Sequence, residues 1–144
     1  MRGSNRAPRL WMALLPLVVL ACSAGPGEVY EEMVAAAAEG NVDRFVAHFS
    51  DESRGLVRGL IELAGAYGGD KKNPLSLIGG GRVVREEPVA CPEESRGAYA
   101  SCNALTIQQG SRYRKLLFVE TDAGWVIDLR VLETFWKDKR NLSF

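Results

Sequence analysis

The spacing of apolar residues changes from a helical to an extended period near Gly81. Before it, strong helix formers at residues 28–39 predict a first helix, which Gly40 ends in a left-handed conformation. Asn41 is placed to cap a second helix over residues 42–49, and Ser50 to cap a third that ends at Gly68. The second helix has a single buried stripe with apolar residues at i, i+3, i+4 and i+7: Val42, Phe45, Val46 and Phe49.

After Gly81 the apolar positions alternate, as they do in strands. Helices followed by strands indicate an α+β domain, and the short glycine-bearing turns favour an antiparallel meander. We expect the N-terminal helices to pack in the concave face of this curved, cone-like sheet. Four strands are predicted, at residues 82–91, 97–109, 112–121 and 124–132.

Cys91 and Cys102 set the register of the first two strands if they face each other. In that register Glu86 and Arg114 share a row on the helix-facing side, with Ile107 between them. Asn103 lies two rows further in. A structural ion pair at the sheet rim is the favoured interpretation of Glu86 and Arg114. In the functional interpretation, Arg114 and Asn103 bind a small polar or acidic ligand while Glu86 orients the arginine.

The opposite face of the predicted sheet is mixed in polarity. It carries both cysteines and an apolar patch formed by Leu117, Val119 and Val126. Exposed patches of this kind mark contact surfaces, so this outer face is predicted as a homodimer contact.

The N-terminus has the layout of a secretory signal, with three arginines and no acidic residue ahead of the apolar run 10–20. Eleven helical residues cover only about half of a ~30 Å hydrocarbon core, which is too short for a membrane span. The segment Val19-Leu20-Ala21-Cys22 resembles the lipobox of bacterial lipoproteins. This resemblance implies a signal peptide over residues 1–21, a lipidated Cys22 and a flexible tether over residues 22–27. It also implies a lipid-anchored protein of the bacterial cell envelope that faces the periplasm or the exterior.

The cysteines fit an oxidising compartment. With Cys22 lipidated, Cys91 and Cys102 remain as an even pair, and a disulfide is the favoured interpretation. No metal site is expected, because His48 is the single histidine and the cysteines lack zinc-site spacing. His48 lies about 60° from the nearest residue of the buried stripe, which favours a boundary position over a general base.

Charge and motifs exclude further classes. All 18 acidic residues follow the signal but three of the 18 basic ones precede Cys22, so residues 22–144 carry a net charge of −3. Such a domain is a poor nucleic-acid binder. The glycines at 79–81 lack the Lys-Ser/Thr of a phosphate loop, and no cofactor is predicted. Residues 133–144 form an amphipathic tail, expected to pack on the domain with its charges in solvent or, as the alternative, to touch a membrane surface.

Two segments resemble the nuclear transport factor 2-like superfamily, and more narrowly its small bacterial lipoproteins of unknown function. They are Gly-Asn-Val-Asp-Arg-Phe-Val-Ala-His-Phe-Ser at 40–50 and Asp-Ala-Gly-Trp-Val-Ile-Asp-Leu at 122–129. The resemblance implies a cone-shaped domain over residues 28–132 with a cavity that relatives use for catalysis, binding or dimerisation. The Asp, His and Tyr groups of the enzymatic relatives match no position here.

These observations favour a membrane-anchored envelope lipoprotein with a non-catalytic domain that binds a small polar ligand or an envelope protein. Two alternatives stay open: a cavity enzyme of the isomerase or dehydratase type, and a purely structural envelope lipoprotein. An open, polar interior would favour binding or catalysis, and a filled interior a structural role.

Cys22→Ser tests the anchor. We expect the variant to lose lipid labelling and to leave the membrane fraction, because the thiol that receives the lipid is gone. Metabolic labelling with a fatty acid and fractionation measure this. A variant that labels and fractionates like the wild type would contradict the lipobox interpretation.

Overall fold

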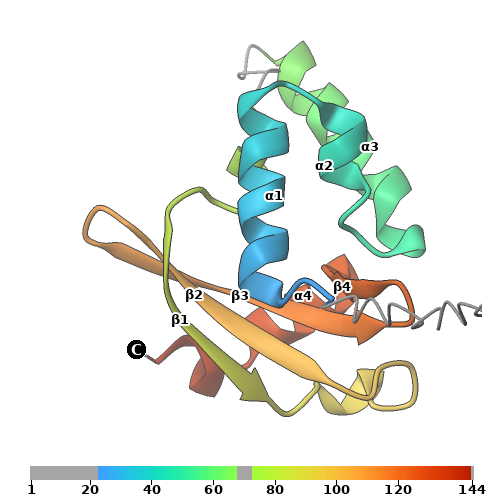
Figure 1. Ribbon diagram of the computed structural model, residues 1–144, viewed down its shortest axis with the longest axis vertical. Coiled ribbons are helices and arrows are strands. Elements are labelled where there is room, and N and C mark those ends of the chain that lie inside the picture. The colour runs from blue at the N-terminus through green and yellow to red at the C-terminus, as the bar shows by residue number, and fades with distance from the viewer. Residues whose placement is uncertain (1–22, 68–72, 144) are drawn as a thin grey trace, which may run out of the picture.

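A computed structural model describes residues 23–67 and 73–143 (Figure 1). It confirms the α+β class and the antiparallel sheet, whose four strands follow the order β1-β2-β3-β4. The predicted signal peptide and Cys22 lie outside the described residues. The helices are α1 (Pro26–Ala38), α2 (Val42–Val46), α3 (Asp51–Ala66) and α4 (Leu129–Lys137), with 3-10 turns η1 (Pro74–Leu77), η2 (Glu93–Ser95) and η3 (Lys139–Leu142). The strands are β1 (Arg82–Val89), β2 (Cys102–Gln109), β3 (Arg112–Thr121) and β4 (Gly124–Val126).

The first three helices form where the pattern predicts them, with different ends. α1 begins at Pro26, inside the predicted tether, because proline suits the first turn of a helix. Asn41 caps α2 as expected, since its side chain accepts a hydrogen bond from the Arg44 amide. α2 ends early because the chain at His48–Ser50 bonds to Ile127: the Ile127 amide donates to the His48 carbonyl and the Ser50 amide to the Ile127 carbonyl.

The sheet register is confirmed between β2 and β3, where Asn103 lies opposite Phe118 and Ile107 opposite Arg114. It is wrong by two residues between β1 and β2. Val89, not Cys91, lies opposite Cys102, and Glu86 therefore faces Leu105. The predicted disulfide joins Cys91 and Cys102, with Cα atoms 5.1 Å apart, but Cys91 follows the strand end. A bridge of this length does not require its cysteines to be opposed in the ladder.

The extent predicted for the last strand is wrong, whereas the tail packs on the domain as expected, with Phe135 buried. The strand predicted at 124–132 ends at Val126, and Asp128 caps α4 instead, accepting hydrogen bonds from the amides of Arg130 and Val131. A carboxylate at this position satisfies two free N–H groups of the first helical turn. The strand predicted at 97–109 likewise begins only at Cys102, after the η2 turn.

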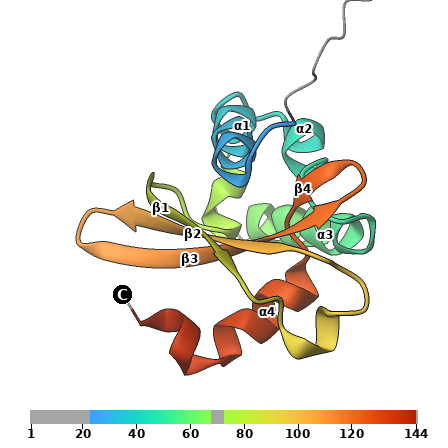
Figure 2. The same ribbon diagram turned by 60° about the horizontal axis from the view of Figure 1, so that its bottom comes forward.

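α1 and α4 lie on opposite faces of the sheet (Figure 2). The surface proposed above for dimerisation is therefore not free: Leu117 and Val119 retain 1% and 0% of their exposure, and Val126 retains 9%. α4 packs against β3, and the Trp136 indole donates to the Lys115 carbonyl. The chain covers this patch with its own C-terminal helix, which the sequence analysis treated as strand and tail.

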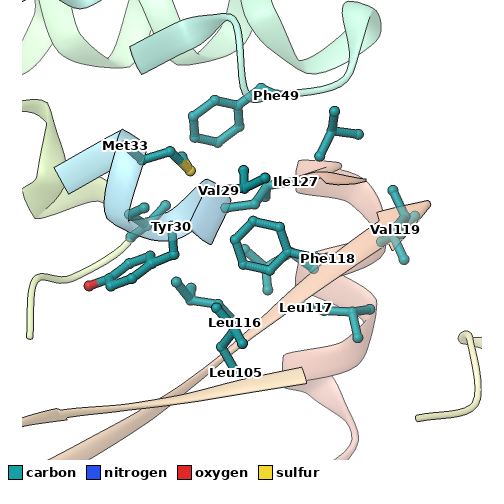
Figure 3. Packing of buried hydrophobic residues seen from close by; sticks show 14 of the residues in the cluster. Val29, Tyr30, Met33, Phe49, Leu105, Leu116, Leu117, Phe118, Val119 and Ile127 are labelled. Carbon is teal, nitrogen blue, oxygen red and sulfur yellow. The ribbon is translucent and has the colours of Figure 1, made fainter. Parts of the chain in front are cut away.

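Apolar side chains fill the space between α1 and the sheet (Figure 3). Met33 of α1, Phe118 of β3 and Phe49 after α2 are fully buried. Burial of a large apolar side chain contributes roughly 1.5–3 kcal/mol, so this contact anchors the helices on the sheet. In the described ranges, no helix combines the length and the apolar character needed to cross a membrane.

The disulfide is expected to stabilise the domain because it limits the unfolded chain. Replacing both Cys91 and Cys102 with serine should lower the free energy of unfolding by ~2–3 kcal/mol, given the sequence separation of 11. Urea unfolding measures the change, and wild-type protein under reductant should show the same loss. Equal midpoints for the variant and the oxidised wild type would contradict the expected role.

Candidate functional site

A groove of about 540 Å³ opens at the end of the sheet where β3 begins. Four segments far apart in the sequence build it: η1, β3, α4 and η3. We call it the Arg114–Trp136 groove. Its lining residues are Ser76, Leu77, Tyr113, Arg114, Lys115, Trp136 and Leu142.

Two contacts position Arg114 in this groove. Its guanidinium carbon lies 6.0 Å from the ring centre of Trp136, at the limit of a cation–π contact. On its other side it lies against the backbone of Gly79, where an added Cβ would approach the guanidinium Nη1 to 2.9 Å. Gly79 also has φ +82°, a conformation that favours glycine.

Gly79 connects the groove to the core. Its carbonyl accepts a hydrogen bond of 3.1 Å from the Tyr30 hydroxyl of α1. Burial raises the pKa of Tyr30, while the nearby charge of Arg114 acts in the opposite direction. The buried phenol of Tyr30 is thus bonded to the loop against which the exposed Arg114 side chain lies.

The groove is cationic. Neither it nor a second groove of about 120 Å³, which shares Tyr113 and Arg114 and includes Arg112, has an acidic lining residue. Among the described residues Arg114 makes no ion pair, whereas the Lys115 ammonium donates to the Ser143 carbonyl. The guanidinium is thus available to an anionic group that enters beside an aromatic surface.

Glu86 is not brought to Arg114. Its carboxylate lies at the start of α1, so close to Gly27 that an added Cβ there would meet the Oε2 atom at 2.7 Å. This places a negative charge at the positive end of the helix, which is favourable. In the described part of the structure, Glu86 therefore adjoins the first turn of α1 and does not orient the arginine.

Asn103 lies elsewhere too. It is four residues from Ile107, the partner of Arg114, which corresponds to roughly 13 Å along the strand. The residue is 8% exposed, and within the described ranges its side-chain oxygen has no hydrogen-bond partner. Of the three predicted ligand residues, the groove contains Arg114 alone.

A buried polar network surrounds Asp128, and the sequence pattern did not predict it. The Tyr99 hydroxyl donates to Asp128 Oδ2 at 2.6 Å, and the Leu129 amide donates to the Ser53 hydroxyl. Asp128 is 6% exposed. Burial and the adjacent carboxylate raise the pKa of Tyr99 to about 12. The signal that could have found this network is an Asp directly before the amphipathic stretch 129–137.

His48 does not form a catalytic group with this network. It is half-buried at the boundary of the core, as its helical position predicts, and burial lowers its pKa. Its charged neighbours are Glu32 and Arg44, and these two pair with each other. Over residues 23–67 and 73–143, no cluster of His, Cys, Asp and Glu is arranged to hold a metal ion.

A third groove, of about 510 Å³, runs beside the disulfide and the end of α4. Arg96 pairs with Glu93 and Arg140 with Asp138, and the Glu94 carboxylate accepts a hydrogen bond from the Thr134 hydroxyl. It contains acidic side chains, which the Arg114–Trp136 groove does not, so the Arg114–Trp136 groove remains the better candidate for an anion.

The chain matches no protein-family model, no curated protein and no solved structure.

Tyr99 should make stability depend on alkaline pH. An unfolded phenol ionises near pH 10, whereas folded Tyr99 keeps its proton up to about pH 12, so the free energy of unfolding falls across this interval. Tyr99→Phe should remove this contribution, seen as a shallower loss of stability in urea unfolding above pH 10. Tyr67→Phe, which alters a ring that is 84% exposed, is the control. Equal pH slopes for wild type and Tyr99→Phe would contradict the expectation.

Proposed function

We propose that this chain is a membrane-anchored envelope lipoprotein whose domain binds a ligand without catalysis. The lipobox-like segment ending at Cys22 supports the anchor. α1 begins at Pro26, four residues later, so an acylated Cys22 would hold the domain close to the membrane. The Cys91–Cys102 disulfide fits an oxidising envelope compartment. Three helices before an antiparallel sheet also fit the nuclear transport factor 2-like assignment, which remains part of the proposal.

The ligand we propose is a small molecule with one anionic group and a flat apolar body. The observation that carries this is the Arg114 guanidinium, which lies beside Trp136 and makes no ion pair with any described residue, in a groove with no acidic residue among its described lining. An anion would bond to Arg114, while its apolar body would lie on Trp136 and Leu142. Leu142 is 40% exposed, so binding would also remove apolar surface from water.

Several contacts favour binding over an enzymatic role. The interior between α1 and the sheet, where a cavity enzyme would place its chemistry, holds Met33, Leu116 and Phe118, each at 0% exposure. The buried carboxylate of Asp128 is used as a helix cap, and Tyr99 donates to it. These groups have structural partners, so they are poor candidates for proton transfer to a substrate.

Naphthalene-2-sulfonate tests the groove, with the uncharged naphthalene-2-sulfonamide as its matched probe. We expect the sulfonate to bind more tightly, and Arg114→Met to weaken its binding about tenfold or more, because a charged hydrogen bond contributes ~1.5–3 kcal/mol. Isothermal titration calorimetry measures both affinities.

The control variant is Arg85→Met, which removes an exposed arginine of β1 away from the groove. It should bind like the wild type. Equal affinity for the two probes, or equal losses in Arg85→Met and Arg114→Met, would contradict the anion site.

A further inference from the structure

α3 carries an exposed apolar stripe on the face turned away from the core. Leu56, Leu60, Leu63 and Tyr67 are 58%, 37%, 53% and 84% exposed, although Val57 and Ile61 of the same helix are buried. Their spacings of four, three and four residues are those of the a and d positions of a heptad repeat. Such a seam is suited to contact with another helix.

The helix surface beside the stripe is flat. At Gly55 and Gly59, no atom lies within 4 Å of the place where a Cβ would be. Both residues are on the same side of the stripe, one position before Leu56 and Leu60. Each glycine in a helix interior lowers the stability of the helix. The two glycines here leave room for another helix to approach α3 closely.

We propose that α3 is a homodimer contact, which pairs antiparallel with α3 of a second copy about a two-fold axis between Gly59 and Leu60. Leu60 of each copy then lies over Gly59 of the other, and Leu56 lies beside Leu63. The Tyr67 hydroxyl reaches the Glu52 carboxylate of the second copy. The stripe is thus complementary to itself in this direction.

Charge argues for a second copy over a lipid surface. A helix that lies on anionic lipids has basic residues along its apolar stripe. On α3 the two arginines are bonded within the chain, Arg54 to Asp51 and Arg58 to Asp43, and Glu52 adjoins the stripe. This inference rests on the lipid anchor proposed above, since anchoring raises the effective concentration of the molecules in the membrane.

Cysteine crosslinking of the full chain in its native membrane tests the contact. Leu60→Cys should give an oxidised dimer at twice the monomer mass, because the two residues flank the axis. Glu31→Cys, at an exposed position of α1, is the matched control and should give little dimer. The wild type is analysed in parallel. If Cys22 is not lipidated, its free thiol can form a crosslinked dimer in the wild type as well, so that a failure of the anchor is distinguished from a failure of the α3 contact. Equal dimer in the two variants, or a product of another mass, would overturn the proposal.

A charge in the seam provides the second measurement. Leu60→Glu should lower the dimer fraction in native mass spectrometry about tenfold, since it places two carboxylates together at the axis. Val84→Glu introduces the same charge at a hydrophobic residue of β1 that is 43% exposed, and should leave the dimer intact. A wild type that is monomeric in the membrane, or a Leu60→Glu variant that dimerises fully, would contradict the α3 contact. Naphthalene-2-sulfonate binding should be unchanged in both variants.

Discussion

Two-sided burial of the central strands is the constraint on which this fold depends. β2 and β3 are apolar on both faces: Leu105 and Phe118 lie under α1, and Leu117 and Val119 are buried on the opposite side. A sheet of this kind needs a cover on each face. The N-terminal helix supplies one and the C-terminal helix supplies the other, so the chain must turn sharply after β4. Asp128 makes that turn possible because its carboxylate satisfies the first amides of α4.

Local sequence signals predicted the elements that local physics determines. The β2–β3 register followed from a two-residue turn at Gly110, whose φ of +61° suits glycine, and Asn41 marked the start of α2. The end of the sheet was not predictable in this way. Val126, Asp128 and Arg130 alternate as a strand does, while residues 129–137 also fit a helix, and burial of the far face of β3 decides between them. That decision depends on a contact distant in sequence.

The candidate site failed to assemble from sequence for the same reason. Arg114 was placed correctly opposite Ile107, but Trp136 and Leu142 come from a helix and a turn that the pattern assigned to strand and tail. Glu86 was separated from Arg114 by a two-residue difference in register. The disulfide does not report that difference, because Cys91 reaches Cys102 from beyond the strand, and an irregularity between Val83 and Arg85 shifts β1 further.

The cover on both faces of the sheet also explains why α3 is left partly bare. With α1 on one face and α4 on the other, α3 packs mainly on α2 and η1 (Figure 1). Only one narrow face of α3 is buried in this packing, and Val57 and Ile61 lie at the centre of that face. A helix that served the core alone would carry polar residues elsewhere, yet α3 presents leucines at heptad spacing. Within residues 23–67 and 73–143 no further layer covers these leucines, and this is why we propose a second copy as their partner.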